Sequence, residues 1–135
     1  MKILNSKKIN DSQFLKREIE SVFIELFIIQ DTKTIAKILH KRGDFSGMIK
    51  ADYIGFLNAF FNSTKHYRCK FSKGYALNEK ITDVVLIFDY YENEIKWHSL
   101  VIHLTINNFR IQKIVDLNIF DILTEKEFNY LQLYN

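Results

Sequence analysis

Asp89 and His98 are the two side chains whose types and spacing best suit proton transfer. Turn-forming residues at Glu92 and Asn93 lie between them, so a hairpin would bring their two strands together. A carboxylate beside an imidazole is a common acid and base combination in enzymes. The alternative is that both side chains are solvated on the outer face of a sheet, where charged residues usually lie. We favour this alternative, so catalysis by Asp89 and His98 is the second hypothesis.

Three other chemical arrangements are excluded by distance or by residue count. Ser99, His103 and Asp116 have the residue types of a catalytic triad, but His103 lies four residues along the strand from Ser99, about 13 Å away. The same argument excludes His98 with His103 as a pair of zinc ligands. Cys69 is the sole cysteine, so no intrachain disulfide or thiolate cluster can form. We therefore expect no metal site and no cofactor.

Four side chains are candidates for lining a ligand pocket: Tyr75, Tyr90, Trp97 and Lys113. Aromatic residues at strand spacing also form ordinary core, so the three aromatic side chains fit both interpretations. Lys113 is the charged member of a row predicted to face inward, which otherwise contains Leu100, Ile102, Leu104, Phe109, Ile111 and Val115. A buried ammonium needs a counter-charge, which a bound anionic small molecule would supply. The alternative is that Lys113 extends its head group to water.

Residues 65 to 73, KHYRCKFSK, mix basic and aromatic side chains as nucleic-acid-binding surfaces do. Strand alternation places the basic side chains outward and the aromatic ones inward, whereas stacking platforms need both on one side. The net charge of +3 is also small for a nucleic-acid-binding domain. We therefore do not expect nucleic acid as a partner. Cys69, between Tyr67 and Phe71, is assigned to the inner face as an unreactive thiol.

The length and composition suit one globular domain. A chain of 135 residues with 47% hydrophobic residues can bury a substantial core, and we expect a single domain over residues 1–135. The most apolar run, Val22 to Ile29, is interrupted by Glu25 and is too short to cross a bilayer. Residues 1 to 12 lack the apolar core of a signal peptide. These features predict a cytoplasmic protein that does not associate with membranes.

Helices dominate the first half of the predicted fold. The apolar spacing predicts helices over residues 11–29, 32–42 and 51–62, and a short strand over residues 44–48. Asn10 is the expected N-cap of the first helix, and Asp31 or Thr32 that of the second. Gly43 is the expected stop of the second helix, whose basic last residues, 40 to 42, suit the negative end of the helix dipole.

Strands make up the second half. A period of two begins at His66 and predicts strands over residues 66–77, 82–91, 94–106 and 109–118. A turn at Asn78 to Lys80 joins the first two of these strands. A β-bulge near His98 and Ser99 explains why the inward set changes parity there.

The last two strands form a long hairpin. Asn107 and Asn108 tolerate positive φ, so we place a two-residue turn there, which pairs Ile106 with Phe109 and Leu104 with Ile111. Thr124 and Glu127 make a capping box, which predicts a short C-terminal helix.

An apolar strip is predicted on the face of the sheet away from the helices. It consists of Val85, Ile87, Val101 and Ile114. Such a strip is costly to leave in contact with water, so we expect a homodimer through this face.

The order of helix, short helix, short strand, helix and four long strands resembles that of the nuclear transport factor 2-like superfamily, also called SnoaL-like. The resemblance also rests on DFSG, Asp44 to Gly47, before the third helix, and on KWHSL, Lys96 to Leu100, around the bulge. It covers almost the whole chain. It implies an α+β fold of the cystatin-like kind, in which a cone-shaped, curved antiparallel sheet wraps around N-terminal helices. It also implies a pocket between sheet and helices, and frequent dimers through the sheet.

The resemblance does not choose a function, because the superfamily includes isomerases, dehydratases, hydrolases, transport factors and binding modules. Its steroid-isomerase-like members use a tyrosine on the first helix with two aspartates, whereas the first helix here has no inward Tyr, Asp or His. We therefore transfer no catalytic position. The leading hypothesis is a small-molecule-binding or protein-interaction module with a sheet-lined cavity. The alternatives are a cofactor-independent acid and base enzyme of isomerase, dehydratase or cyclase type, and a partner-binding protein that uses the outer sheet.

Overall fold

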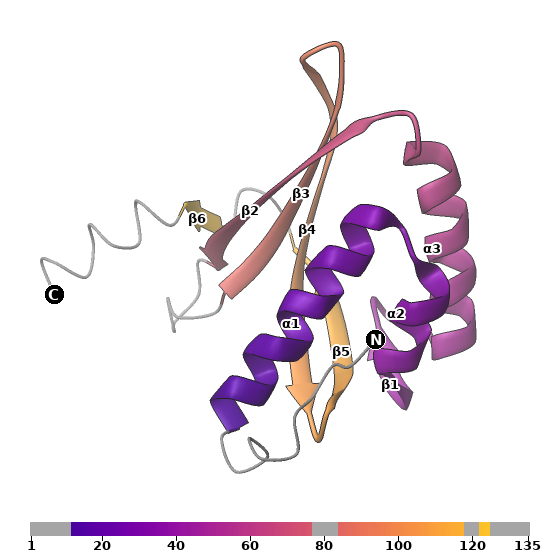
Figure 1. Ribbon diagram of the computed structural model, residues 1–135, viewed down its shortest axis with the longest axis vertical. Helices are drawn as coiled ribbons and strands as arrows, with labels where there is room; N and C mark the ends of the chain where they lie inside the picture. Colours follow the sequence, from indigo (N-terminus) through magenta and orange to yellow (C-terminus); the bar gives the residue numbers. More distant parts are fainter. Residues whose placement is uncertain (1–11, 77–83, 118–121, 125–135) are drawn as a thin grey trace, which may run out of the picture. The chain divides into compact units, whose positions relative to one another are not determined.

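The computed structural model describes residues 12–76, 84–117 and 122–124 (Figure 1). The chain divides into two compact units. The first contains the residues up to Ser63 together with Leu104–Ile114, and the second contains Thr64–His103 and the residues from Val115 onward. Strands β4 (Ile95–Asn107) and β5 (Arg110–Asp116) each pass from one unit into the other.

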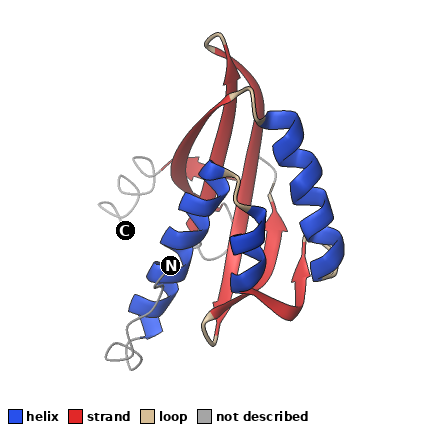
Figure 2. Ribbon diagram, turned by 45° about the vertical axis from the view of Figure 1, so that its right-hand side comes forward, coloured by secondary structure: helices blue, strands red, loops and turns tan. Residues whose placement is uncertain are grey.

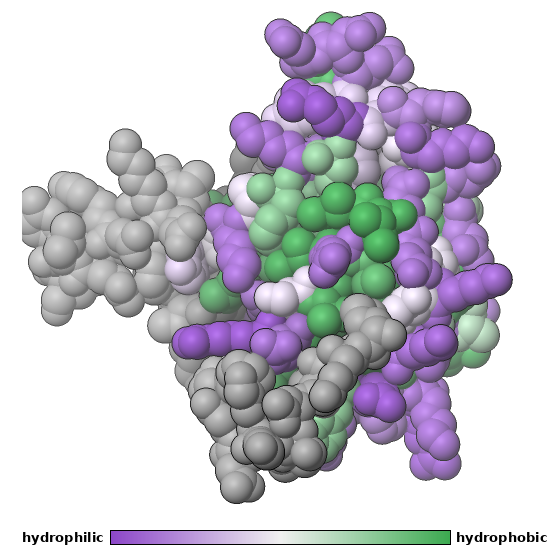
Figure 3. Space-filling model, in the orientation of Figure 1, coloured by the Kyte–Doolittle hydropathy of each residue, from purple (hydrophilic) through white to green (hydrophobic). Residues whose placement is uncertain are grey.

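Helix α1 (Ser12–Ile29) begins the first unit and confirms the predicted helix; its expected N-cap, Asn10, lies outside the described residues. The buried side chains recur at helical spacing: Ile19, Phe23, Leu26 and Phe27. Phe27 meets Phe61 of α3 (Lys50–Thr64) edge to face, with ring centroids 4.9 Å apart. Ile28 and Ile29 are exposed, and Figure 3 shows apolar side chains gathered over this end of α1.

Helix α2 (Thr32–Ile38) confirms the predicted start and corrects the predicted end. Asp31 is the N-cap, because its carboxylate accepts hydrogen bonds from the backbone N and the hydroxyl of Thr34, at 3.1 and 2.7 Å. The helix stops at Ile38, so residues 40 to 42 do not lie at a helix end and Gly43 is not a helix stop. These residues belong to strand β1 (Leu39–Phe45) instead.

Strand β1 forms because it pairs in parallel with β5, joining Leu39 to Ile111 and Phe45 to Ile114. All four of these side chains are buried. This long-range pairing overrides the local helical pattern of residues 39 to 42. The predicted strand over residues 44–48 therefore starts and ends earlier than expected. A tight turn at Ser46 and Gly47, both with positive φ, connects β1 to α3, whose predicted range of residues 51–62 is confirmed with small extensions.

The second unit is an antiparallel arrangement with the order β4-β3-β2-β6. Strand β2 (Arg68–Ala76) pairs with β3 (Val84–Glu92) and with the short β6 (Ile122–Thr124). The predicted alternation along the first part of β2 is confirmed: Cys69 and Phe71 are half-buried, and Arg68, Lys70 and Ser72 are exposed. The predicted turn at residues 78–80 and the predicted C-terminal helix beyond Thr124 lie outside the described residues.

Both hairpin turns lie one residue later than predicted. The β3–β4 turn is at Asn93 and Glu94, with φ of 49° and 69°. The β4–β5 turn is at Asn108 and Phe109, with φ of 48° and 69°. Strand β5 therefore begins at Arg110, and the predicted pairing of Ile106 with Phe109 is wrong because Phe109 is in the turn.

The predicted bulge is present at Trp97, one position before the expected residues. Tyr91 pairs with Lys96 and Tyr90 pairs with His98, so Trp97 is the extra residue on β4. The fold class is confirmed as α+β, with N-terminal helices and a mostly antiparallel open sheet (Figure 2). The pairing of β1 with β5 is the parallel exception among the described strands.

Candidate functional site

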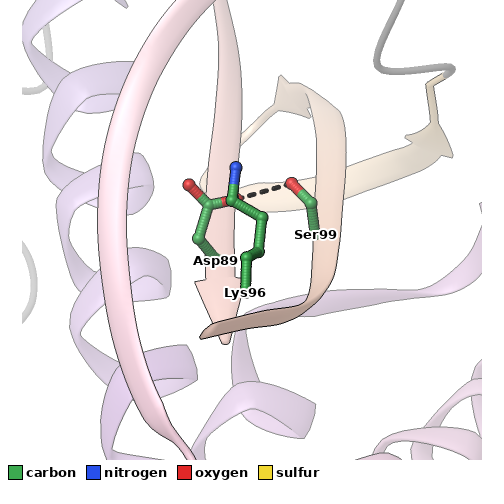
Figure 4. Close-up of polar contacts among 3 residues, drawn as sticks. All are labelled: Asp89, Lys96 and Ser99. Carbon is green, nitrogen blue, oxygen red and sulfur yellow. Dashed lines mark hydrogen bonds and ion pairs between the residues drawn. The ribbon is translucent and has the colours of Figure 1, made fainter. Parts of the chain in front are cut away.

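Asp89 lies in a small polar cluster on β3 and β4 (Figure 4). The hydroxyl of Ser99, its direct cross-strand neighbour, donates a 2.6 Å hydrogen bond to Asp89 Oδ1. Lys96 Nζ lies 3.7 Å from the same oxygen, and the Asp89 side chain is only 13% exposed. A hydrogen bond to a charged acceptor is stronger than one between neutral groups. The Asp89 carboxylate is thus held in place by a hydroxyl and an ammonium group.

His98 is not brought to this cluster. It pairs with Tyr90, the residue after Asp89, and neighbouring strand residues point to opposite faces. The side chains of Asp89 and His98 therefore leave the sheet on opposite sides. His98 is exposed, and its ring centroid lies 5.5 Å from that of Trp97. The predicted acid and base pair is not assembled in this geometry.

The three aromatic pocket candidates lie in different surroundings. Tyr90 is buried, and its hydroxyl interacts with the thiol of Cys69 across the β2–β3 pair. Burial raises the pKa of both groups above their usual values, and the Tyr90 hydroxyl partly offsets this rise for Cys69. Tyr75 is half-buried opposite Val84. Trp97 is 52% exposed and stacks on Tyr67 with ring centroids 4.7 Å apart. A common pocket for these rings stays a prediction.

Lys113 is exposed, which differs from its expected place in an inward row. It lies opposite Asp44 in the β1–β5 pair. The buried residues of β5 are Ile111 and Ile114, which are three apart, so the strict alternation that placed Lys113 inward is broken. The ammonium group reaches water, as in the alternative interpretation.

The residues of the predicted dimer strip are buried within the chain. Val85, Ile87 and Val101 form one cluster with Ala76, and Leu117 and Ile122 pack against it. Ile114, in the other unit, is also buried. The expectation that these side chains form an exposed strip is therefore wrong, because the chain covers them itself. The homodimer stays a prediction.

A groove in the first unit was not anticipated. Its volume is about 630 Å³. Four cationic side chains line it: Lys37, Lys41, Lys50 and Arg110. The other lining residues are Leu39, His40, Asn108 and Phe109. No carboxylate is among the described residues that line it, so we name it the cationic groove.

Four elements of the first unit build the cationic groove. The last turn of α2 supplies Lys37, β1 supplies residues 39 to 41, α3 begins with Lys50, and the β4–β5 hairpin supplies residues 108 to 110. Lys50 Nζ donates a 3.1 Å hydrogen bond to the carbonyl of Leu39, which ties α3 to β1. Arg110 donates a 3.0 Å hydrogen bond to the carbonyl of Phe109, which holds the guanidinium beside the turn.

His40 completes the lining as a hydrogen-bond acceptor. The backbone N of Arg42 donates a 3.0 Å hydrogen bond to His40 Nδ1, so the proton of the neutral ring is on Nε2. The basic cluster of His40, Lys41 and Arg42 is evident in the sequence, but it was interpreted as complementing the negative end of a helix dipole. Only the meeting of β1 with the β4–β5 turn reveals that His40 and Lys41 line a groove.

The described residues contain no group of three or more His, Cys, Asp or Glu side chains placed to hold a metal ion. Among the helices that the structure describes, none is long and apolar enough to cross a membrane.

The cationic groove can attract anions, because ammonium and guanidinium groups bind carboxylates and phosphates through charge-assisted hydrogen bonds.

Comparison with known proteins finds similarity at the level of structure. No protein-family model matches the sequence, and no curated protein matches it. Several solved structures resemble the chain. A SnoaL-like polyketide cyclase from Agrobacterium tumefaciens C58 has a TM-score of 0.51 at 13% identity, over 87% of this chain and 96% of that one. A cystatin-fold protein from Novosphingobium aromaticivorans has a TM-score of 0.53 at 11% identity, over 75% of this chain and 96% of that one.

The third structure is of a protein from Pseudomonas putida KT2440 that is described as a polyketide cyclase. It has a TM-score of 0.51 at 14% identity, over 77% of this chain and 92% of that one. At such identities the similarity establishes the fold and not the activity. The chain has the nuclear transport factor 2-like fold, as the sequence resemblance predicted.

Proposed function

We propose that this protein, which has the nuclear transport factor 2-like fold, is a small-molecule-binding module whose cationic groove receives an anionic group of the ligand. The observation that carries the proposal is the composition of the groove: Lys37, Lys41, Lys50 and Arg110 line it, without a carboxylate among the described lining residues. Its volume of about 630 Å³ lies in the range of small-molecule sites.

Electrostatics favour an anion at this place. Lys37, Lys41 and Arg110 are exposed, so their repulsion is reduced by water and salt but not removed. A bound carboxylate or phosphate would offset that repulsion and accept several charge-assisted hydrogen bonds. Arg110 offers two parallel donors, whereas each lysine offers a point charge. Because the site is open to solvent, we expect an affinity that falls as salt is added.

An acid and base enzyme is the alternative function. Two of the similar solved structures are of proteins described as polyketide cyclases. Such chemistry would need a base and an acid near one ligand, and Asp89 and His98 lie on opposite faces of their strands. Binding without catalysis by this pair is therefore the proposal that the geometry supports better. The cytoplasmic location predicted from the sequence is part of the same proposal.

The test is calorimetric titration with inorganic phosphate and with acetate. The double variant Lys41→Gln with Arg110→Gln removes two charges from the groove. We expect it to weaken phosphate binding at least tenfold, because each charge-assisted hydrogen bond contributes roughly 1.5 to 3 kcal/mol.

The matched control is the double variant Lys65→Gln with Lys70→Gln. It removes two charges from exposed positions outside the groove, so it separates a local effect from a change in net charge. We expect an affinity within twofold of the wild type. Absence of binding at millimolar anion, or equal weakening by both double variants, would contradict the proposal.

A further inference from the structure

A second groove lies beside the cationic groove in the first unit. Its volume is about 320 Å³. Apolar side chains form most of its lining: Leu15 and Ile19 from α1, Ile106 from β4, and Phe109. Lys16, Asn107 and Asn108 supply the polar part of the lining. We name it the apolar groove.

The two grooves share Asn108 and Phe109. The β4–β5 turn therefore forms a wall common to both, with charged residues on one side and apolar residues on the other. Phe109 is half-buried, so part of its ring remains accessible to a ligand. A molecule that occupied both grooves would pass along this turn.

Phe109 has a positive φ, a backbone conformation that does not favour a phenylalanine at this position of the turn. Asn108 and Phe109 have φ of 48° and 69°, the geometry in which the second position strongly prefers glycine. A bulky residue with positive φ is uncommon, and strained residues tend to cluster at functional sites. The β3–β4 turn has the same pair of angles at Asn93 and Glu94, but Glu94 is exposed.

We propose that the ligand is a free amphiphilic anion, with its charged head in the cationic groove and an aliphatic tail in the apolar groove. The inference rests on the proposed function and adds the class of ligand. Phe109 lies where head and tail meet, and its ring covers the first part of the tail. The volumes of about 630 and 320 Å³ suit a single small molecule rather than a membrane surface.

The experiment uses inorganic phosphate and n-alkyl phosphates from methyl to octyl, titrated below the concentrations at which they form micelles. The measured quantity is the ratio of octyl phosphate affinity to inorganic phosphate affinity for each protein variant. A fully buried methylene strengthens binding about fourfold. Because the apolar groove is partly open, we expect a gain of about twofold per methylene until the groove is filled.

Two variants test the role of the apolar groove. Phe109→Gly removes the ring while giving the turn its preferred residue, so the relieved backbone strain offsets the burial lost with the ring and the protein should fold as the wild type does. Leu15→Ala shortens a side chain that lines only the apolar groove. Both should lower the affinity ratio, and Phe109→Gly should bring it to within about threefold of one. Glu94→Gly is the matched control, because it relieves the same backbone geometry at a residue that lines neither groove and should leave the ratio unchanged.

The outcomes separate the two proposals. If phosphate binds but the wild-type ratio is close to one, the amphiphile is excluded and the anion-binding proposal stands. If neither phosphate nor any alkyl phosphate binds, both proposals fail. Binding to vesicles that contain phosphatidic acid, without binding to monomeric octyl phosphate, would overturn the free-ligand inference in favour of a lipid surface.

Discussion

Replacing Gly43 by alanine should destabilise the strand that carries part of the cationic groove. Gly43 is in β1, between Lys41 and Phe45. A Cβ atom at this position would lie 2.5 Å from the backbone oxygen of Gln112 on β5 and closer still to the ring of Phe45. Both distances are much shorter than a normal van der Waals contact. The backbone of β1 or β5 must therefore shift.

The surroundings of Gly43 indicate a loss of folding stability near the upper end of the range that is usual for overpacking. Phe45 is fully buried, so its ring has little room to move, and the second contact is with backbone rather than a flexible side chain. Overpacking of this kind typically costs about 1 to 3 kcal/mol, and we expect about 2 to 3 kcal/mol here. For a protein of this size, that corresponds to a fall in Tm of about 6 to 15 °C.

The assay is urea denaturation and thermal unfolding followed by circular dichroism, with Gly55→Ala as the matched control. Gly55 is exposed in α3, and a Cβ atom there meets nothing within 4 Å. Alanine is the better helix former, so this variant should gain about 0.5 to 1 kcal/mol. Replacing glycine by alanine should thus lower the free energy of unfolding at Gly43 and raise it at Gly55. If the free energy of unfolding of Gly43→Ala is within 0.5 kcal/mol of the wild-type value, the close approach of β1 to β5 is refuted.

Two further predictions concern ionisable groups. Burial raises the pKa of Cys69, the Tyr90 hydroxyl lowers it, and the nearby charge of Asp89 raises it. The pH at which thiol labelling reaches half its maximal rate should therefore rise in Tyr90→Phe and fall in Asp89→Asn; a shift of equal sign in both would contradict this assignment. The hydrogen bonds from Thr34 lower the pKa of Asp31, so its contribution to stability is present above the usual carboxyl pKa and is lost as the pH falls through the lower folded value. Asp31→Ala should make unfolding less sensitive to pH in that acid range, and an unchanged acid limb of the stability curve would exclude the cap as a contributor.

Elements with strong local periodicity could be predicted from sequence. The stripe of Ile19, Phe23 and Leu26 is sufficient to identify α1, because helical spacing is a local property. Strand β1 could not be predicted in the same way. Its pairing with β5 joins Leu39 to Ile111, which is far along the chain, while residues 39 to 42 locally continue a helical pattern. Since β1 supplies His40 and Lys41, the cationic groove was missed with it.

The positions of the two hairpin turns were predicted wrongly for the same reason. In each, asparagine takes the first position with positive φ, and a residue that normally avoids positive φ takes the second: Glu94 in one turn and Phe109 in the other. Sequence reasoning placed each turn one residue early because neither of these residues marks a turn. A glycine at either position would have placed the turn correctly.

The comparison of these turns also indicates why Phe109 is the informative residue. Since the backbone angles are nearly the same, the geometry of the turn does not decide which side chain occupies the second position. At Glu94 the side chain is exposed, so its charge can be solvated without further contacts. At Phe109 the ring is half-buried and lines both grooves, which depends on long-range structure that the local sequence does not encode. A residue kept against local preference is expected where surrounding structure or a ligand compensates for the strain. Phe109, one of the positions at which prediction from sequence failed, is therefore also the residue on which the amphiphile hypothesis most directly depends.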